Sequence, residues 1–357
     1  MVVRWWPHNP DPAIASTRLR CHAVIAVLRE RGQDVGLFDA REAAPDVLVL
    51  LKRYDASSVA AAEALRRRFG TRLALDLCDN HFYDSSGDPA WRDRAAQLRR
   101  AVVAVDRVVA STPTLAGVVR EEAAEARVSV IGDIAEGEAA AVRGRSVSRA
   151  SAEFALARLR RGLERSGVPR SRRLVWFGNH GSPNAEGGMT DLLRIRGTLE
   201  DVASTLPITL TVISNHPGKF RSISMGWRLP IRYLEWNATT FSRALRLHGV
   251  SVIPVGLNPF TACKTNNRVC TSLLHDLAVV ADAVPSYCEF DEAIRIGDWK
   301  TSLVATLEDS RETVRRIECG RALVAARYGA DAIGAQWLGL LESLRAGSPR
   351  GTPASSS

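Results

Sequence analysis

The chain has 357 residues, of which 46% are hydrophobic and 24% charged, a composition typical of globular proteins. This length exceeds that of one ordinary hydrophobic core and predicts two domains. No apolar run approaches the roughly 20 residues that span a bilayer, and the N-terminal stretch MVVRWWPHNP lacks the apolar segment of a signal peptide. The cysteines are scattered without metal-ligand spacing and are expected to be free thiols, so we expect a cytoplasmic protein.

The formal net charge is +9, which fits three kinds of partner: nucleic acid, anionic lipid headgroups or a phosphorylated substrate. The densest basic stretch covers residues 143–173 and contains one aromatic residue, Phe154. Nucleic-acid-binding surfaces interleave aromatic and basic residues, so we expect no nucleic acid as partner. Two interpretations of this stretch stay open. It is either a solvated interdomain helix or a surface that makes peripheral contact with the inner face of an anionic membrane.

The first part of the chain alternates short apolar runs with helical stretches, which is the pattern of a parallel α/β sheet. Strands are expected at residues 2–6, 34–40, 47–51, 73–79, 107–111 and 128–133. Helices are expected at 16–32, 58–70 and 95–105. The alternation ends near Glu136, so the first domain is predicted to cover residues 1–140.

A second α/β series follows an Arg-rich linker that we place at residues 141–170. The second domain is predicted over 171–324, with strands at 173–178, 208–215, 230–236 and 250–256. The tail at 347–357 has the composition of a disordered segment. Two Rossmann-like domains facing across a cleft are the simplest account, with the ligand beyond the carboxyl ends of the strands.

Lysine is rare in this chain, and the stretch TACKTNNRVC contains one of only four. Asn266 and Asn267 are typical N-cap residues, so Lys264 and Arg268 lie on either side of a predicted helix start. Two cations and the positive end of a helix dipole suit a diphosphate. The alternative is a solvated helix start without a ligand.

Two other strand ends carry candidate site residues. Gly178 and Asn179 follow the strand of VWFGNHGSPNAEGG, where a small loop before a helix favours an anion. In the first domain, Asp76, Asp79 and His81 lie at the end of the strand in LALDLCDNHFYD. We expect a structural role for Asp76, whereas Asp79 and His81 are candidates for a general base or for holding sugar hydroxyls.

These stretches, together with ASTRLR, VLLKRYD, VVASTPTLAGVV, IRYLEWN and VSVIPVGLNPFTACKTNNRVCTSLLHDLAVVADAVPSY, resemble the GT-B glycosyltransferases. More specifically, the chain looks like the retaining family of bacterial surface-polysaccharide and lipopolysaccharide enzymes. The resemblance covers nearly the whole chain, and its most specific part is the last segment, which is similar to the family's donor-binding segment. It implies an acceptor domain, a donor domain and a final helix, 325–346 around Trp337, that packs back on the first domain.

The resemblance also implies an activity: transfer of a hexose-type sugar from a nucleotide-sugar to a polysaccharide, lipid-linked or small-molecule acceptor. Members of this fold generally work without a bound metal ion or cofactor, so the resemblance implies that cations of the protein neutralise the leaving diphosphate. The implied phosphate-binding residues are Gly178, Asn179, Lys219, Lys264, Thr265, Asn267 and Arg268. The implied neighbours of the nucleotide base are Glu235 and Trp236.

On the acceptor side the resemblance implies Ser16 and Arg18, with Asp79 and His81 as the catalytic candidates. A retaining reaction requires no strong base, whereas an inverting one makes Asp79 the first candidate. The family typically carries two glutamates eight positions apart, and Cys263 and Thr271 take their places here. That departure leaves open a catalytically weakened GT-B protein that binds sugar nucleotides or serves as a partner subunit. A basic nucleic-acid-associated protein is the remaining alternative.

Overall fold

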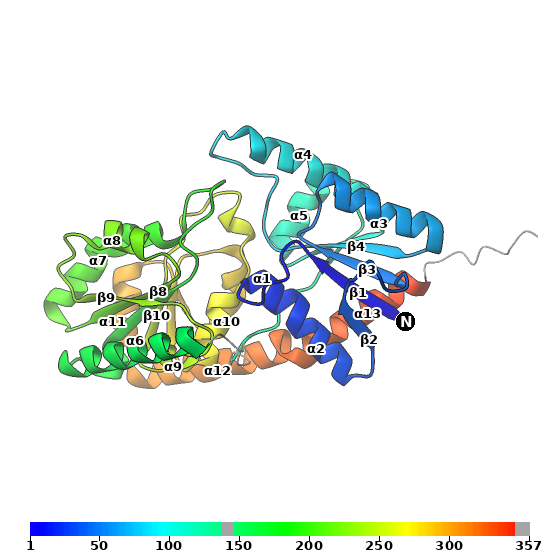
Figure 1. Cartoon of the computed structure of the whole chain (residues 1–357). Coiled ribbons are helices and arrows are strands. Elements are labelled where there is room, and N and C mark those ends of the chain that lie inside the picture. The colour runs from blue at the N-terminus through cyan, green and yellow to red at the C-terminus, as the bar shows by residue number, and fades with distance from the viewer. Residues whose placement is uncertain (138–145, 347–357) are drawn as a thin grey trace, which may run out of the picture. The chain divides into compact units, whose positions relative to one another are not determined.

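A computed structural model of the protein describes residues 1–137 and 146–346. The chain divides into two compact units, each built on one parallel six-stranded sheet (Figure 1). Unit 1 consists of Met1–Cys78, Asp93–Gly132 and the segment that begins at Ala330. Unit 2 consists of Asp79–Arg92 and Asp133–Gly329. The two sheets confirm the α/β class that the alternation of strands and helices predicts.

The sheet of unit 1 has the strand order β2-β1-β3-β4-β5-β6, with all neighbouring strands parallel. Its strands are β1 (Val2–Pro7), β2 (Asp34–Leu37), β3 (Val47–Leu51), β4 (Arg72–Leu77), β5 (Arg107–Ala110) and β6 (Val128–Val130). Each coincides with an apolar run predicted from the sequence. β3 is buried along its whole length, as expected of a central strand in a parallel sheet.

Helices follow most strands of unit 1. They are α1 (Ala15–Thr17), η1 (Arg18–His22), α2 (Ala23–Glu30), α3 (Ala56–Phe69), α4 (Pro89–Ala104), α5 (Pro113–Glu122) and α13 (Ala330–Ala346). The α3 helix begins at the N-cap residue Asp55, whose carboxylate accepts a hydrogen bond from the Ser58 N–H. It ends at Gly70 in the left-handed conformation that glycine adopts without strain.

The C-terminal helix α13 completes the core of unit 1. Trp337 is fully buried, and its ring meets that of Trp5 edge-on with centroids 5.6 Å apart. Gly334 faces α2, and a Cβ atom at that position would lie 2.6 Å from a methyl carbon of Val27. The close approach of the two helices therefore depends on a residue without a side chain.

A fully buried ion pair joins β4 to η1 in unit 1. The Arg20 guanidinium binds both carboxylate oxygens of Asp76, with Nε at 2.9 and 3.1 Å and Nη2 at 2.5 Å. Its Nη1 donates to the Ile131 carbonyl at 3.0 Å. Burial, and then the Asp76 charge, raise the pKa of the adjacent Cys21 to about 12. These bonds give Asp76 a structural role inside unit 1.

The sheet of unit 2 has the strand order β12-β11-β10-β7-β8-β9, again all parallel. Its strands are β7 (Arg173–Phe177), β8 (Thr209–Ser214), β9 (Ile231–Glu235), β10 (Val250–Ile253), β11 (Ala278–Ala281) and β12 (Arg295–Ile296). The two-residue strand β12 has no counterpart among the predicted strands, because so short a segment leaves no periodic signal.

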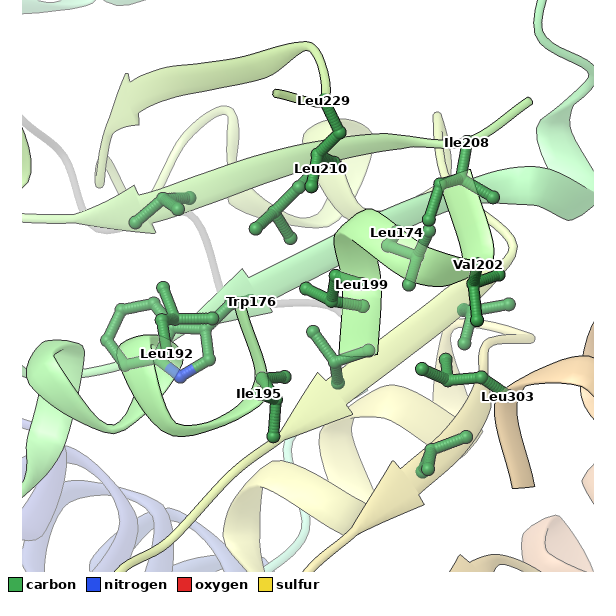
Figure 2. Packing of buried hydrophobic residues seen from close by; sticks show 14 of the residues in the cluster. Leu174, Trp176, Leu192, Ile195, Leu199, Val202, Ile208, Leu210, Leu229 and Leu303 are labelled. Carbon is green, nitrogen blue, oxygen red and sulfur yellow. The ribbon is translucent and has the colours of Figure 1, made fainter. Parts of the chain in front are cut away.

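Helices α7 and α11 build one side of the core of unit 2. Figure 2 shows Leu192, Ile195 and Leu199 of α7 packed against Leu174 and Trp176 of β7. The helices of this unit are α6 (Ser146–Arg165), α7 (Leu192–Thr205), α8 (Pro217–Ser224), α9 (Phe241–Leu245), α10 (Asn267–Leu274), α11 (Trp299–Glu308) and α12 (Ser310–Tyr328). None of the described helices combines the length and the apolarity that crossing a membrane requires.

The Arg-rich stretch that we expected to be a linker forms α6 and belongs to unit 2. Leu156, Leu159 and Leu163 recur at helical spacing and pack into a core cluster with β7 and β9. The physical reason for the difference is this narrow apolar stripe, which the surrounding arginines obscure in the sequence. Residues 141–145 of the expected linker and the expected disordered tail, 347–357, lie outside the described residues.

Candidate functional site

The candidate site is built on the carboxyl ends of β7 and β10, which are neighbours in the sheet of unit 2. The loop 178–188 follows β7, and the loop 254–266 follows β10 and leads into α10. Because parallel strands end at the same edge, the Gly178 loop and the Lys264–Arg268 stretch lie next to each other. The structure thus brings together two motifs that are about 90 positions apart in the sequence.

Arg268 lies against Gly178. A Cβ atom placed on Gly178 would be 3.6 Å from the Cδ atom of Arg268, a side chain in the first turn of α10. Within the described part of the chain, the Arg268 guanidinium forms no salt bridge, although its charge acts on the nearby Asp191. The N-cap residue Asn266 makes no capping hydrogen bond and donates instead to Glu289 at 3.0 Å. A guanidinium and an uncapped helix start therefore meet at this loop.

Lys264 has a carboxylate partner. Its ammonium lies 2.5 Å from Oδ1 of Asp79 and 4.0 Å from the ring centroid of Phe260. The Lys264 side chain is 36% exposed and that of Asp79 is 15% exposed. We expected Asp79 in the first domain, but the contacts of segment 79–92 group it with unit 2. The two residues predicted to serve as phosphate ligand and base are paired with each other.

Segment 79–92 is fixed to both loops of the site by hydrogen bonds to backbone carbonyls. Asn80 donates to the Pro259 carbonyl at 3.0 Å, and Asn184 donates to the Tyr83 carbonyl at 2.9 Å. The Ser85 N–H donates to the Asn184 carbonyl at 2.9 Å. These bonds hold the segment in a defined conformation against the Gly178 loop and the loop after β10.

His81, the second catalytic candidate, is packed between aromatic rings. Its ring lies 5.7 Å from that of Trp91 and is stacked at 6.4 Å on that of Phe260, centroid to centroid. The side chain is buried. In this structure the imidazole therefore contributes to the packing of segment 79–92 on the loop after β10.

Asp191 is a site residue that the sequence analysis missed. Its carboxylate is buried and accepts hydrogen bonds from the Gly188 N–H at 2.9 Å and the Gly256 N–H at 3.1 Å. Burial raises the pKa of Asp191, against the two hydrogen bonds and the charges of Arg268 and Arg194, which lower it. This single carboxylate joins the loop after β7 to the loop after β10. In the sequence, its position in GGMTDLL indicates only a helix start. Its partners are backbone N–H groups, which leave no recognisable residue pattern.

The loop after β7 is tightly folded at two glycines. Gly188 has a φ of +82°, and a Cβ atom there would lie 2.7 Å from the Cα atom of Gly181. A Cβ atom on Gly181 would in turn be 3.2 Å from the ammonium nitrogen of Lys219. Lys219 lies in the first turn of α8, where its N–H donates to the ring of the N-cap residue His216 at 2.9 Å. Lys219 and Arg268 thus approach the same loop from different helices.

The other residues of unit 2 that were predicted to belong to the site do not gather around Arg268 and Lys219 in the same way. Asn267 donates to the carboxylate of Asp133, and Trp236 packs in the core cluster beside Phe241, with ring centroids 6.2 Å apart. Glu235 is exposed at the end of the edge strand β9. Asn179 is exposed and Thr265 half-buried, and neither side chain makes a hydrogen bond among the described residues.

On unit 1, the predicted acceptor residues belong to the first helical turns. Ser16 lies within α1, and Arg18 opens η1, where its guanidinium donates to the Pro12 carbonyl at 3.1 Å and the Ala13 carbonyl at 3.4 Å. These backbone bonds hold the loop before α1.

No group of three or more His, Cys, Asp or Glu side chains among the described residues has the geometry of a metal site. All six cysteines are free, in agreement with their expected state. Cys263 is 1% exposed and Thr271 is 8% exposed. The side chains at the two positions where the similar family carries glutamate are therefore buried, and neither is a carboxylate.

No protein-family model and no curated protein sequence matches the chain. Among solved structures, it is similar to TarM, with 9% identity and a TM-score of 0.59 over 82% of this chain and 54% of TarM. The chain thus spans about half the length of TarM. Another solved form, S. aureus TarM in complex with fondaparinux, alpha-GlcNAc-glycerol and UDP, has 10% identity and a TM-score of 0.56, covering 82% of this chain and 55% of that chain.

Trehalose-6-phosphate proteins are similar over more of their own length. The E. coli structure bound with UDP-2-fluoro glucose has 14% identity and a TM-score of 0.55, covering 92% of this chain and 78% of that chain. The synthase from Burkholderia multivorans has 13% identity and a TM-score of 0.56, covering 84% and 70%. Likeness at these identities concerns the fold. Together with the two parallel six-stranded units, it shows that the chain has the GT-B fold.

Proposed function

We propose that the chain is a glycosyltransferase that takes a nucleotide-sugar donor at the carboxyl edge of the unit 2 sheet. The observation that carries this proposal is the Arg268 guanidinium, which lies beside Gly178 and has no carboxylate bound to it among the described residues. Lys219 and the start of α10 add positive potential at the same loop. Such a place suits the diphosphate of a sugar nucleotide.

In the proposed reaction, the bond between the anomeric carbon and the donor phosphate oxygen breaks while the acceptor oxygen bonds to that carbon. The acceptor proton passes to the leaving nucleoside diphosphate in a retaining course, and Asp79 must first break its pair with Lys264 to accept it in an inverting one. The paired state of Asp79 supports the retaining course. Arg268 and Lys219 stabilise the charge that builds on the leaving group, so we propose a metal-independent reaction without a cofactor.

We propose a glycan, a lipid-linked saccharide or a small hydroxylated molecule as the acceptor, and Ser16 and Arg18 as residues on its side. The UDP and sugar ligands named for the similar structures support this class of substrates. A cytoplasmic location, where sugar nucleotides are made, agrees with the six free thiols.

A nucleotide screen tests the proposal. We expect one of UDP, GDP, dTDP and CMP to raise the melting temperature of the wild-type protein, because a ligand that binds only the folded state stabilises it. Arg268→Ala should weaken binding of that nucleotide by about tenfold or more, the equivalent of one charge-assisted hydrogen bond. The matched control is Arg120→Ala, an exposed arginine of α5 in unit 1, which should bind as the wild type does. Equal loss in both variants, or none in either, would contradict the assignment.

A catalytically weakened sugar-nucleotide binder is the second candidate, and the lack of a carboxylate at Cys263 and Thr271 favours it. Nucleotide release from a sugar nucleotide separates the two: an enzyme releases nucleotide at a rate that Arg268→Ala reduces. A binder is stabilised by the nucleotide and releases none. Absence of any nucleotide effect, together with tight duplex binding, would leave only a nucleic-acid-associated protein.

A further inference from the structure

A second basic surface of unit 2 is a groove between α6 and the end of α9. The groove has a volume of about 630 Å³, within the range of roughly 300 to 1,000 Å³ that small-molecule sites occupy. Two arginines of α6 and two from the α9 side line it, over an apolar floor that includes Leu156 and Leu247. The four arginines are Arg160, Arg161, Arg243 and Arg246.

The two helices that form the walls of this groove pack on the same hydrophobic core. Leu159 and Leu163 of α6 and Phe241 and Leu245 of α9 all belong to one core cluster on the sheet. The Arg243–Glu153 salt bridge joins the two helices directly. The arginines are therefore presented at a fixed spacing, which lowers the entropy lost on binding a ligand.

The groove carries an excess of positive charge. Its arginines outnumber its two glutamates, of which Glu153 is bound by Arg243 and Glu164 lies 3.5 Å from Arg160. The hydrogen bond from Arg243 is the main cause of the lowered pKa of Glu153, which stays ionised. Arg161 makes no salt bridge with any described residue. At least one guanidinium is thus open to an external anion.

This groove is at the opposite edge of the sheet from the candidate active site. Arg170 donates to the Arg246 carbonyl at 3.0 Å, and the Gly249 N–H donates to the Arg173 carbonyl at 3.0 Å. Because β7 begins at Arg173 and ends before Gly178, Arg246, which directly follows α9, lies at the amino-terminal edge. No residue of the loops 178–188 and 254–266 lines the groove.

We propose that the groove is a second anion site, which binds a phosphate ester carried by a sugar or by a lipid headgroup. Guanidinium groups from two helices can each bind two oxygens of one phosphate. Leu156 and Leu247 then contact the apolar part of the ester. Phe154, 70% exposed, lies on the adjoining face of α6 in line with Arg158 and Arg161, at four- and three-residue spacing. The site is independent of the proposed sugar transfer.

The test uses the full chain carrying Arg268→Ala, so that phosphate binding at the candidate active site is weakened equally in every variant compared. The probes are glycerol 1-phosphate, followed by calorimetry, and phosphatidylglycerol vesicles, followed by co-sedimentation against phosphatidylcholine vesicles. The groove variant adds Arg161→Ala and Arg246→Ala. The control adds Arg311→Ala and Arg120→Ala, which remove two exposed arginines from other helices.

We expect at least one probe to bind the Arg268→Ala chain, and the dissociation constant to rise about tenfold for each guanidinium removed from the groove. The control should bind as its parent does. Binding of vesicles alone supports the site with a lipid headgroup as ligand, and binding of glycerol 1-phosphate alone supports it with a soluble phosphorylated sugar. Failure of both probes to bind, or equal weakening in groove and control variants, overturns the site. Arg161→Gln alone, a change at an exposed side chain, repeats the test if the double variant does not fold.

Discussion

Two carboxylates three positions apart in the sequence form ion pairs of opposite character. Asp76, in β4, is 0% exposed and bound by the 1% exposed Arg20 through three N–O contacts. Asp79, just past the strand, makes one close contact with Lys264, and both of these side chains are partly exposed. The first pair is sealed inside unit 1, and the second is open to water in unit 2.

The difference shows how burial assigns a role to a charged residue. A buried pair cannot be broken without leaving a charge in a medium that solvates it poorly, so it is fixed for the lifetime of the fold. A partly exposed pair is worth little to stability and can exchange one partner for another anion. Sequence spacing alone does not distinguish the two cases, whereas solvent exposure does.

Asp76→Asn is the largest expected effect. The amide cannot neutralise Arg20, whose buried charge is left without a counter-ion, and we expect the free energy of unfolding to fall by about 3 to 5 kcal/mol. Urea denaturation followed by circular dichroism measures it. Asp34→Asn is the control within unit 1, because it removes the exposed partner of Arg4 and should cost about 0 to 1 kcal/mol. Similar losses of stability in the two variants would show that burial does not decide whether an ion pair is structural.

His248 extends the contrast to a group that burial keeps uncharged. Its ring nitrogens lie 2.9 Å from the Ala244 carbonyl and 2.8 Å from the Thr211 hydroxyl. Burial lowers its pKa to about 4, whereas the unfolded value is about 6.5. The folded state therefore binds fewer protons between these two values, so its stability is complete above about pH 6.5, falls as the pH drops below that, and has lost the full contribution near pH 4.

We expect this titration to remove about 3 kcal/mol from the free energy of unfolding between pH 7 and pH 4. Urea midpoints at several pH values measure the loss. His248→Gln should be less stable than the wild type at pH 7 but less sensitive to acid. An unchanged pH dependence in that variant would mean that other groups cause the acid sensitivity.

Asp79→Asn is the smallest expected effect on stability, about 0 to 1 kcal/mol. Because Lys264 loses its counter-ion while the amide oxygen can still accept a hydrogen bond, nucleotide affinity should rise by up to about fivefold. Thermal denaturation and nucleotide titration measure the two quantities on the same protein. A loss of stability as large as that of Asp76→Asn would make both pairs structural. A fall in turnover with unchanged nucleotide affinity would instead identify Asp79 as the base.

Most strands were predictable because they are short apolar runs between turn residues, as in Val47–Leu51 and Thr209–Ser214, whereas the two-residue strand β12 was not. Helix α6 was missed as part of unit 2 because a three-leucine stripe carries less signal than the arginines around it. The neighbouring positions of Gly178 and Arg268 followed from parallel topology, which places strand ends at one edge.

Other features of the site could not be predicted. Lys264 and Asp79 are 185 positions apart, and no local pattern links an ammonium to a carboxylate over that distance. Asp191 was missed for a different reason: it binds backbone N–H groups, which every residue carries. Charge spacing in the sequence thus locates cations at helix starts but does not reveal which of them already have a partner.

The contact of Gly188 with Gly181 has a consequence for finding relatives of this chain. Arginine and lysine can replace each other at many surfaces and can reach one spot from several backbone positions. A turn in which two Cα regions touch tolerates no extra carbon, so its two glycines are fixed both in identity and in spacing. A search that requires this glycine pair before a buried aspartate should pick out the same loop more selectively than one based on its charged residues.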